Sequence, residues 1–480
     1  MTTNRPTDAF QPRLRPLAAC LAACMAASAG AAAVRSSSPL LPAGLLARPA
    51  AAAIATQVNA ARSPASNLVV SNCDDSGAGS LRDALQAAAD GDTVDLTQLT
   101  CSRISLGTGA IVFGASNVAV VGPGENKLMI DGTLSGGVLY HLGSGTLIVQ
   151  DLSIGYGFKY RNDVDVRGSC VHTEGNVILT NVAITTCNTV SASRYSALGG
   201  AVWSTGATQL IHSRITASEA HASGFGYASG GGVYALGGLT SFYSTIDRNV
   251  VLSEDPTSPT FGGGAFARGG VLIVGTTVSN NQAMRMGGLA LADNGGQPAT
   301  IVNSTVSGNI AQKIGGVFSR AALNLYNTTI AFNTSREWSD GGGHYFGAGV
   351  YITVPGEMDS TIIANNVNTD PAAPTPTADL TGALGAGFSG GNNNVMFCGS
   401  ACPTDTSHED PGLHPLADNG GPTLTHVPTP GQWDTFGGTN PLNWQWDQRG
   451  PGFPRDPASD RMEIGSYQPN SDIIFVNGFN

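Results

Sequence analysis

The chain has 480 residues, of which 64 are glycine and only 12% are charged. Its 34 acidic and 23 basic residues give a net charge of −11, and no basic run occurs, so nucleic-acid binding is excluded as a function. Abundant glycine with few charges is typical of a chain that makes many tight turns between stacked strands.

Residues 1–33 are predicted to be an export signal. Three arginines near the start are followed by an apolar, alanine-rich stretch from Leu17 to Ala33, which ends in small residues that suit cleavage. The stretch is too short for a comfortable transmembrane helix, and no transmembrane segment is expected. Leu21–Cys24 also fits a bacterial lipoprotein box, so a lipid on Cys24 is an alternative anchoring route. Residues 34–66, rich in Ala, Pro and Ser, are predicted to be a linker.

Residues 67–103 are predicted to cap the fold at its N-terminal end. Ser80 suits a helix N-cap, and an apolar stripe runs from Leu81 to Ala88, just before Gly91. A stack of coils exposes an open core and unpaired strand edges at its first coil. We therefore expect this short helix to cover that end.

One short pattern is repeated six times in residues 198–366. Most copies begin with two glycines and an apolar residue, as in Gly231-Gly232-Val233, and all end in a hydroxyl-rich stretch such as Ser304-Thr305-Val306. The final residues of these endings are Ile215, Ile246, Val278, Val306, Ile330 and Ile362. A spacing that varies between neighbouring copies indicates a common unit with loops of different lengths inserted into it.

Apolar and hydroxyl residues alternate over the last five positions of each copy, which predicts a single strand with one buried face. An asparagine stands three residues beyond five of these endings, at Asn249, Asn281, Asn309, Asn333 and Asn365. Asparagine tolerates left-handed backbone and can bond to an identical residue stacked above it. These asparagines are predicted to form a structural ladder at one corner. The resulting prediction is all-β, with a parallel β-helix over residues 104–400. Residues 67–400 together are expected to form about a dozen coils.

A second column follows the glycine step and consists of Val202, Tyr234, Phe266, Ala290, Phe318 and Tyr351. Strand alternation points this column away from the coil interior. One hypothesis is that Tyr234, Phe266, Phe318 and Tyr351 form a flat ligand track for sugar rings or a partner surface. The alternative is that the rings stack along the sheet or lie under an inserted loop.

Six cysteines remain after the predicted signal, and an even number in an exported chain favours disulfides over metal binding. Proximity in sequence suggests the pairs Cys73–Cys101, Cys170–Cys187 and Cys398–Cys402, although connectivity cannot be derived from sequence. No metal and no other cofactor is expected.

Two regions resemble a known family. Ser76-Gly77-Ala78-Gly79-Ser80-Leu81-Arg82-Asp83-Ala84 resembles the opening of secreted bacterial β-helix proteins of the pectate-lyase-like superfamily, which implies a right-handed helix. Within residues 401–467, Asp410–His426, Asp447–Gly450 and Glu463–Tyr467 resemble the "choice-of-anchor Q" region that closes many such proteins.

The C-terminal resemblance has two departures: Met462 and Gln468 stand where the family has a cysteine and an acidic residue. Residues 468–480 are a short tail, interpreted either as a secretion tag or as a frayed end.

The sequence offers weak candidates for catalysis. A glycosidase or lyase on this fold needs acidic residues that converge from neighbouring coils, but Asp247 stands alone in its column. Among loop residues, Asp163 and Asp165 suit a cation, and Asp340 and His344 suit a sugar, unless both loops are merely polar.

We therefore expect an exported, non-catalytic monomer at the cell surface or in the medium. Its predicted partners are polysaccharides or other surface ligands, as for an adhesin. The alternatives are a polysaccharide lyase or glycoside hydrolase acting on the β-helix face, and a purely structural spacer.

Overall fold

The computed structural model describes residues 66–469, except 256, 294, 338–345, 373–378, 430–436 and 456–461. The predicted signal, residues 34–65 of the linker, the loop candidates Asp340 and His344, and the end of the tail lie outside these described residues. No helix in the described part of the chain is long and apolar enough to cross a membrane.

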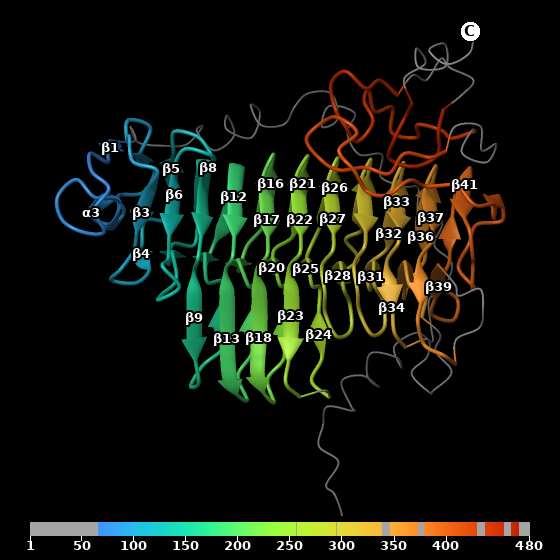
Figure 1. The fold of residues 1–480 in the computed structure, drawn as a ribbon, viewed down its shortest axis with the longest axis horizontal. Helices are drawn as coiled ribbons and strands as arrows, with labels where there is room; N and C mark the ends of the chain where they lie inside the picture. The colour runs from blue at the N-terminus through green and yellow to red at the C-terminus, as the bar shows by residue number, and fades with distance from the viewer. Residues whose placement is uncertain are drawn as a thin grey trace, which may run out of the picture. The chain divides into compact units, whose positions relative to one another are not determined.

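The described chain folds into stacked coils whose successive strands pair in parallel, which confirms the predicted all-β parallel β-helix (Figure 1). The longest sheet, here called the long sheet, comprises β1 (Asn67–Val69), β2 (Thr93–Asp95), β3 (Arg103–Ser105), β5 (Val118–Val121), β6 (Met129–Asp131), β8 (Thr146–Gly155), β12 (Asn176–Thr185), β16 (Thr208–Ile211), β17 (Arg214–Thr216), β21 (Leu239–Phe242), β22 (Thr245–Asp247), β26 (Val271–Val274), β27 (Thr277–Ser279), β29 (Ala299–Val302), β30 (Thr305–Ser307), β32 (Leu323–Tyr326), β33 (Thr329–Ala331), β36 (Gly356–Asp359), β37 (Ile362–Ala364), β40 (Phe388–Ser389), β41 (Asn393–Val395) and β42 (Thr406–Ser407).

A ten-stranded sheet closes the opposite side of the coils. It comprises β4 (Ile111–Phe113), β7 (Leu139–His141), β11 (Val171–Thr173), β15 (Val202–Ser204), β20 (Val233–Ala235), β25 (Ala265–Arg268), β28 (Leu289–Ala292), β31 (Val317–Ser319), β35 (Val350–Ile352) and β39 (Leu380–Gly382). Each coil contributes one strand, so the first and last strands are nine turns apart. The ten-stranded sheet spans fewer turns than the expected dozen, because β1 and β2 pair only within the long sheet and several coils are lengthened by extra strands.

These extra strands form a projection, here called the fin, between the long sheet and the ten-stranded sheet (Figure 1). One of its sheets comprises β9 (Phe158–Arg161), β13 (Asn188–Ser193), β18 (Glu219–Gly224) and β23 (Val250–Ser253), and the other comprises β10 (Val166–Arg167), β14 (Ala197–Leu198), β19 (Ala228–Ser229) and β24 (Thr260–Phe261). A small core, mostly of alanine, packs between them. Further along the helix, β34 (Thr334–Ser335) and β38 (Val367–Asn368) form a two-stranded sheet.

The N-terminal stretch contains α3 (Leu81–Ala87), where the sequence predicts a helix. The Ser80 hydroxyl accepts a hydrogen bond from the Asp83 amide at 3.2 Å, and Leu81 and Leu85 are buried in the main core. The three disulfides suggested by proximity, Cys73–Cys101, Cys170–Cys187 and Cys398–Cys402, are all formed.

The hydroxyl-rich stretch of each copy is two short strands with a bend between them, where the sequence pattern predicted one strand. The bend residues adopt left-handed backbone, with φ of 48° at His212 and 47° at Tyr243. The following serine or threonine is buried and forms its own ladder: the Ser213 amide donates to the Ser244 hydroxyl at 3.0 Å, and that hydroxyl donates to the Phe242 carbonyl. Alternation does not continue across the bend, because a left-handed residue turns the chain and so changes which of the following side chains face the interior.

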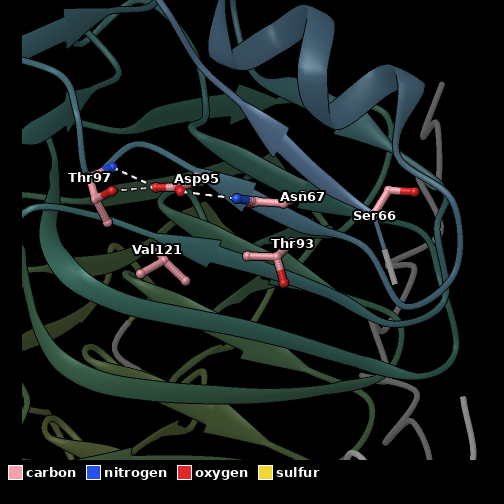
Figure 2. A pocket seen from close by; sticks show the side chains of 6 residues that line it. All are labelled: Ser66, Asn67, Thr93, Asp95, Thr97 and Val121. Atoms are coloured by element: carbon pink, nitrogen blue, oxygen red, sulfur yellow. Dashed lines mark hydrogen bonds between the residues drawn. The ribbon is translucent and has the colours of Figure 1, made fainter. Parts of the chain in front are cut away.

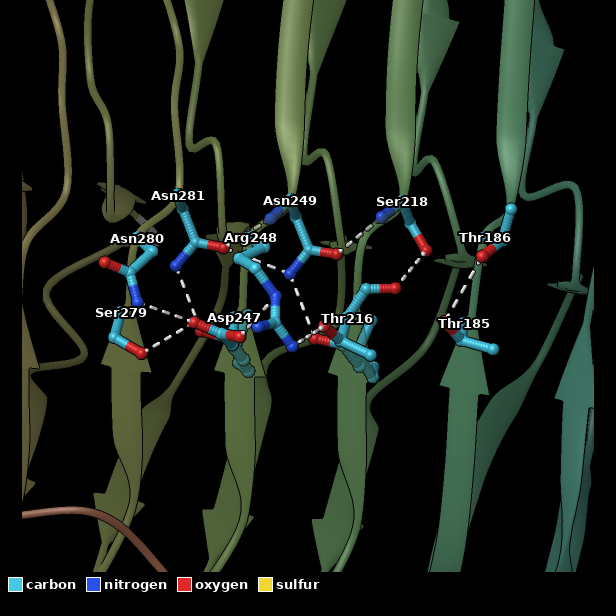
Figure 3. A network of polar contacts seen from close by, with 12 residues as sticks. Thr185, Thr186, Thr216, Ser218, Asp247, Arg248, Asn249, Ser279, Asn280 and Asn281 are labelled. Carbon is cyan, nitrogen blue, oxygen red and sulfur yellow. Dashed lines mark hydrogen bonds and ion pairs between the residues drawn. The ribbon is translucent and has the colours of Figure 1, made fainter. Parts of the chain in front are cut away.

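Asparagines stack at the next corner, immediately before the fin (Figure 3). In each rung the side-chain oxygen accepts from both the backbone amide and the side-chain amide of the preceding asparagine, as Asn281 does for Asn249 at 2.9 and 3.0 Å. The rungs are Ser218, Asn249, Asn281, Asn309, Asn333 and Asn366, and the carboxylate of Asp379 accepts the last pair of bonds. The expected rung at Asn365 was wrong.

The error at Asn365 is a shift of one residue in the last copy. Ile330 lies beside Ile363, not Ile362, so the ladder position moves to Asn366. The first copy is shifted in the same way, because Val202 lies beside Val233 and Trp203 lies beside Tyr234. Trp203, and not Val202, therefore belongs to the aromatic column.

The C-terminal region packs on the outer face of the long sheet, over β26 to β37 (Figure 1). The Gln448 side chain accepts from the Thr305 hydroxyl at 2.6 Å and donates to the Thr277 hydroxyl at 2.9 Å. Arg449 pairs with Asp447 at 2.7 Å, and its guanidinium lies between the rings of Phe453 and Tyr467. Asp447, Gln448 and Arg449 therefore hold this region together and attach it to the sheet.

Candidate ligand-binding site

The outer face of the ten-stranded sheet carries one column of side chains that crosses every coil. In register these residues are Val112, Tyr140, His172, Trp203, Tyr234, Phe266, Ala290, Phe318, Tyr351 and Thr381. Each follows an inward-facing aliphatic residue, so strand alternation directs the column outward, as the sequence pattern predicted. The column also extends three coils beyond the repeat on its N-terminal side.

The rings do not form the exposed track that the sequence suggested. Tyr234 is 8% exposed and Tyr351 is 7% exposed, whereas Phe266 and Phe318 are half-buried. Residues at the base of the fin and in the equivalent loops cover the rings, including Leu198, Phe261, Met286, Ile314 and Phe346. The middle of the column is therefore a secondary apolar core, as the alternative interpretation proposed.

Aromatic and charged side chains lie together at the N-terminal end of the same column, where three aromatic rings stack on consecutive coils. The imidazole of His172 lies 3.9 Å from the ring centroid of Tyr140 and is nearly parallel to it, and lies 4.6 Å from that of Trp203. Such short distances are possible because adjacent parallel strands are spaced about 4.8 Å apart. The Tyr140 ring is half-buried, and those of His172 and Trp203 are buried.

Two cations lie on the faces of these rings. The ammonium of Lys159, on β9, lies 4.4 Å from the centroid of Tyr140, and the guanidinium of Arg167, on β10, lies 4.7 Å from that of Trp203. Both side chains come from the base of the fin and reach over the ten-stranded sheet. Cations prefer ring faces because the aromatic quadrupole places negative charge there.

Lys159 has neutral hydrogen-bond partners. Its ammonium donates to the carbonyl oxygens of Arg167 at 2.9 Å and Gly168 at 3.3 Å, and it makes no ion pair with a carboxylate among the described residues. Burial, together with the nearby charge of Arg167, lowers the pKa of Lys159 to about 7. The lysine can therefore exchange its proton near neutral pH.

His172 and Glu174 complete the cluster. The Nε2 atom of His172 lies 3.0 Å from a carboxylate oxygen of Glu174, and the other oxygen accepts from the Thr205 hydroxyl at 3.1 Å. Burial and the charge of Lys159 lower the pKa of His172 to about 4, so the imidazole is neutral at physiological pH. Burial acts to raise the pKa of Glu174, but hydrogen bonds from His172 and Thr205 lower it overall, so Glu174 is ionised.

The predicted loop residues Asp163 and Asp165 have separate structural partners. Asp163 pairs with Arg161 through two contacts of 2.9 Å in an exposed turn at the tip of the fin. Asp165 accepts a hydrogen bond from the backbone amide of Ser196 at 2.8 Å and so joins two turns of the fin. The described residues contain no cluster of three or more His, Cys, Asp or Glu that could hold a metal ion.

Asp247, which the sequence left alone in its column, is also structural (Figure 3). Its carboxylate accepts from the Ser279 hydroxyl at 2.9 Å and from the Asn280 amide at 3.0 Å, and it pairs with Arg248 at 2.9 Å. These contacts tie neighbouring coils together beside the asparagine ladder.

A shallow hollow of about 250 Å³ lies over the first strands of the long sheet (Figure 2). It is lined by Ser66, Asn67, Thr93, Asp95, Thr97 and Val121. The carboxylate of Asp95 is already bonded to the Thr97 amide and hydroxyl and to the Asn67 side chain, and the bonds from Thr97 lower its pKa. The hollow therefore offers no uncommitted charged group.

Comparisons with known proteins concern the fold alone. No family model matches the chain, and no curated protein matches it. Among solved structures the chain is similar to pectate lyase Pel9A, with 12% identity over 85% of this chain and 98% of that one, at a TM-score of 0.35.

Proposed function

We propose that this protein is exported and binds polysaccharide without cleaving it, at the cluster of Tyr140, Lys159, Arg167, His172 and Trp203. The observation that carries the proposal is the stack of three rings with two cations on their faces, built on rigid neighbouring strands. Sugars present apolar C–H faces that pack on aromatic rings and hydroxyls that bond to charged groups. Tyr140 is half-buried and is the most exposed ring of this stack.

Export is supported by two independent features. Three disulfides join the described residues, and such bonds persist in oxidising compartments outside the cytosol. The positively charged, alanine-rich leader of residues 1–33 is the second feature. We further propose that residues 401–467 form an anchor-type region, with Cys24 and the C-terminal tail as alternative points of attachment.

One observation favours a lyase as the second candidate. Lys159 has a pKa of about 7 and lies near Arg167, so its neutral amine could take a proton from a sugar ring at physiological pH. Against this role, the Lys159 nitrogen is directed at the carbonyl oxygens of Arg167 and Gly168 and at the Tyr140 ring, so its contacts are with the protein itself. We therefore assign Lys159 a role in ligand binding and treat cleavage of the polysaccharide as the competing outcome of the test.

The test is a binding screen of the full exported chain against neutral and acidic polysaccharides, using affinity electrophoresis and calorimetry. Tyr140→Ala should weaken binding roughly tenfold or more, since it removes the most exposed ring of the stack and the aromatic contact of Lys159. Tyr160→Ala is the matched control, because Tyr160 is a 52% exposed tyrosine on β9, the fin strand that also carries Lys159. Unsaturated sugar products in the same mixtures would show that the protein is a lyase and would contradict non-catalytic binding. Equal binding by both variants would show that the cluster around Tyr140 is not the binding site.

A further inference from the structure

Two buried hydrogen-bond donors in this cluster have no acceptor. They are the Nε atom of Arg167 and the indole Nε1 atom of Trp203. Because the guanidinium stacks on the Trp203 ring, these donors belong to one small region of the site. A buried donor left unpaired costs about 1–3 kcal/mol, and most such groups in proteins are satisfied.

The charge of this region is also uncompensated. Arg167 makes no ion pair with a carboxylate among the described residues, and Lys159 bonds only to carbonyl oxygens and the Tyr140 ring. Glu174 is the acidic group whose charge acts on Arg167, but its two oxygens are occupied by His172 and Thr205. Two cations therefore face one committed carboxylate, in a chain whose net charge is −11.

The chemistry of the two donors selects the missing partner. A guanidinium presents its N–H groups as a planar fork that matches the oxygens of a carboxylate or a sulfate. An indole N–H adds one further donor, and a lysine nearby adds charge without a fixed direction. A cation cannot bind beside two cations, and a neutral sugar leaves their charge uncompensated.

We infer that Arg167 and Trp203, with Lys159, form a receptor for one oxyanion group, a carboxylate or a sulfate ester, carried by the polysaccharide. This inference rests on the proposed function and names the class of ligand: an acidic glycan whose anionic group enters the fork of Arg167 while a sugar contacts the exposed part of Tyr140. The same chemistry would accept a free carboxylate or sulfate ion.

The experiment uses the full chain in two arms at constant ionic strength. In the first arm, sodium acetate and sodium sulfate replace sodium chloride, with calorimetry and tryptophan fluorescence as readouts. In the second arm, a polyuronate is compared with the same polymer after reduction of its carboxyl groups to alcohols. The variants are Arg167→Gln and Arg167→Lys, and Arg161→Gln is the control, because Arg161 is an exposed arginine already paired with Asp163.

We expect the polyuronate to bind roughly tenfold or more tightly than its reduced form, and Arg167→Gln to abolish that difference. Arg167→Lys should retain part of it, and Arg161→Gln all of it, with thermal unfolding unchanged to show that each variant is folded. If both polymers bind wild-type protein equally, the oxyanion receptor is wrong and the proposed function stands. If no polymer binds but acetate or sulfate binds wild type and not Arg167→Gln, the receptor stands and the proposed function is wrong.

Discussion

The asparagine ladder allows a stability prediction to be worked from individual bonds. In Asn309 the side-chain amide donates to the Val278 carbonyl at 3.0 Å and to the Asn333 side chain at 2.9 Å. Its oxygen accepts from the backbone and side-chain amides of Asn281, both at 2.9 Å. All of these groups are buried, so water cannot replace the lost partners in Asn309→Ala.

Three groups lose a partner in that variant: the Asn281 backbone amide, one Asn281 side-chain N–H and the Val278 carbonyl. Asn333 is spared, because its oxygen still accepts from the Asn309 backbone amide. At about 1–1.5 kcal/mol for each of these three unpaired buried groups, Asn309→Ala should lower the free energy of unfolding by about 3–4.5 kcal/mol. The substitution also opens a small void, which adds to this loss.

The assay combines chemical denaturation with amide hydrogen exchange, since a stack of coils can unfold in parts. Exchange at the Asn281 amide should accelerate far more than exchange at amides two coils away. Asn365→Ala is the control. Asn365 is half-buried with a φ of 58° and lies outside the ladder, so its replacement should lower the free energy of unfolding by only about 1 kcal/mol. Equal losses in the two variants, or unchanged protection at Asn281, would refute the reasoning.

Three further predictions concern attachment and pH. Gln448→Ala removes the bonds to Thr277 and Thr305, so residues 401–467 should become sensitive to limited proteolysis while the β-sheet circular dichroism is retained; unchanged cleavage would contradict this role. Oxyanion affinity should rise as the pH falls from about 9 to 6, because Lys159 gains its proton near its pKa of about 7. Lys159→Met should remove this pH dependence. A wild-type affinity that does not change over this pH range would contradict the role of Lys159. Burial raises the pKa of Asp379 to about 7, above its ordinary value of 3.8, so its contribution to stability is largest below pH 3.8 and is lost as pH rises through about 7. Thermal unfolding from pH 4 to 8 should show this slope in wild type but not in Asp379→Asn, and identical slopes would exclude Asp379 as the titrating group.

The sequence predicted the architecture because the relevant forces are local and repeated. Alternation within three or four residues defines a strand, and asparagine beyond it defines a corner, so six copies predict a parallel β-helix with an internal ladder. The N-terminal helix was predicted from Ser80 and the apolar stripe that follows it. The disulfide pairs were suggested by proximity along the chain.

Register at the two ends of the repeat could not be read from sequence. The run Gly230-Gly231-Gly232 can be aligned with the first copy in two ways, and so can Ser360-Thr361-Ile362-Ile363 with the fifth. Only interstrand pairing decides between them, and it places Trp203 in the aromatic column and Asn366 in the ladder.

The candidate site depended still more on tertiary structure. Its residues come from strands of three consecutive coils and from both sheets of the fin, and most lie before the repeat begins at residue 198. Nothing in the spacing of Tyr140, Lys159, Arg167 and Trp203 shows that two cations will lie on two stacked rings. Local alternation determined that the aromatic column points outward, but only the folded fin decided that its middle is covered and that its N-terminal end carries charge, because that packing joins residues through space.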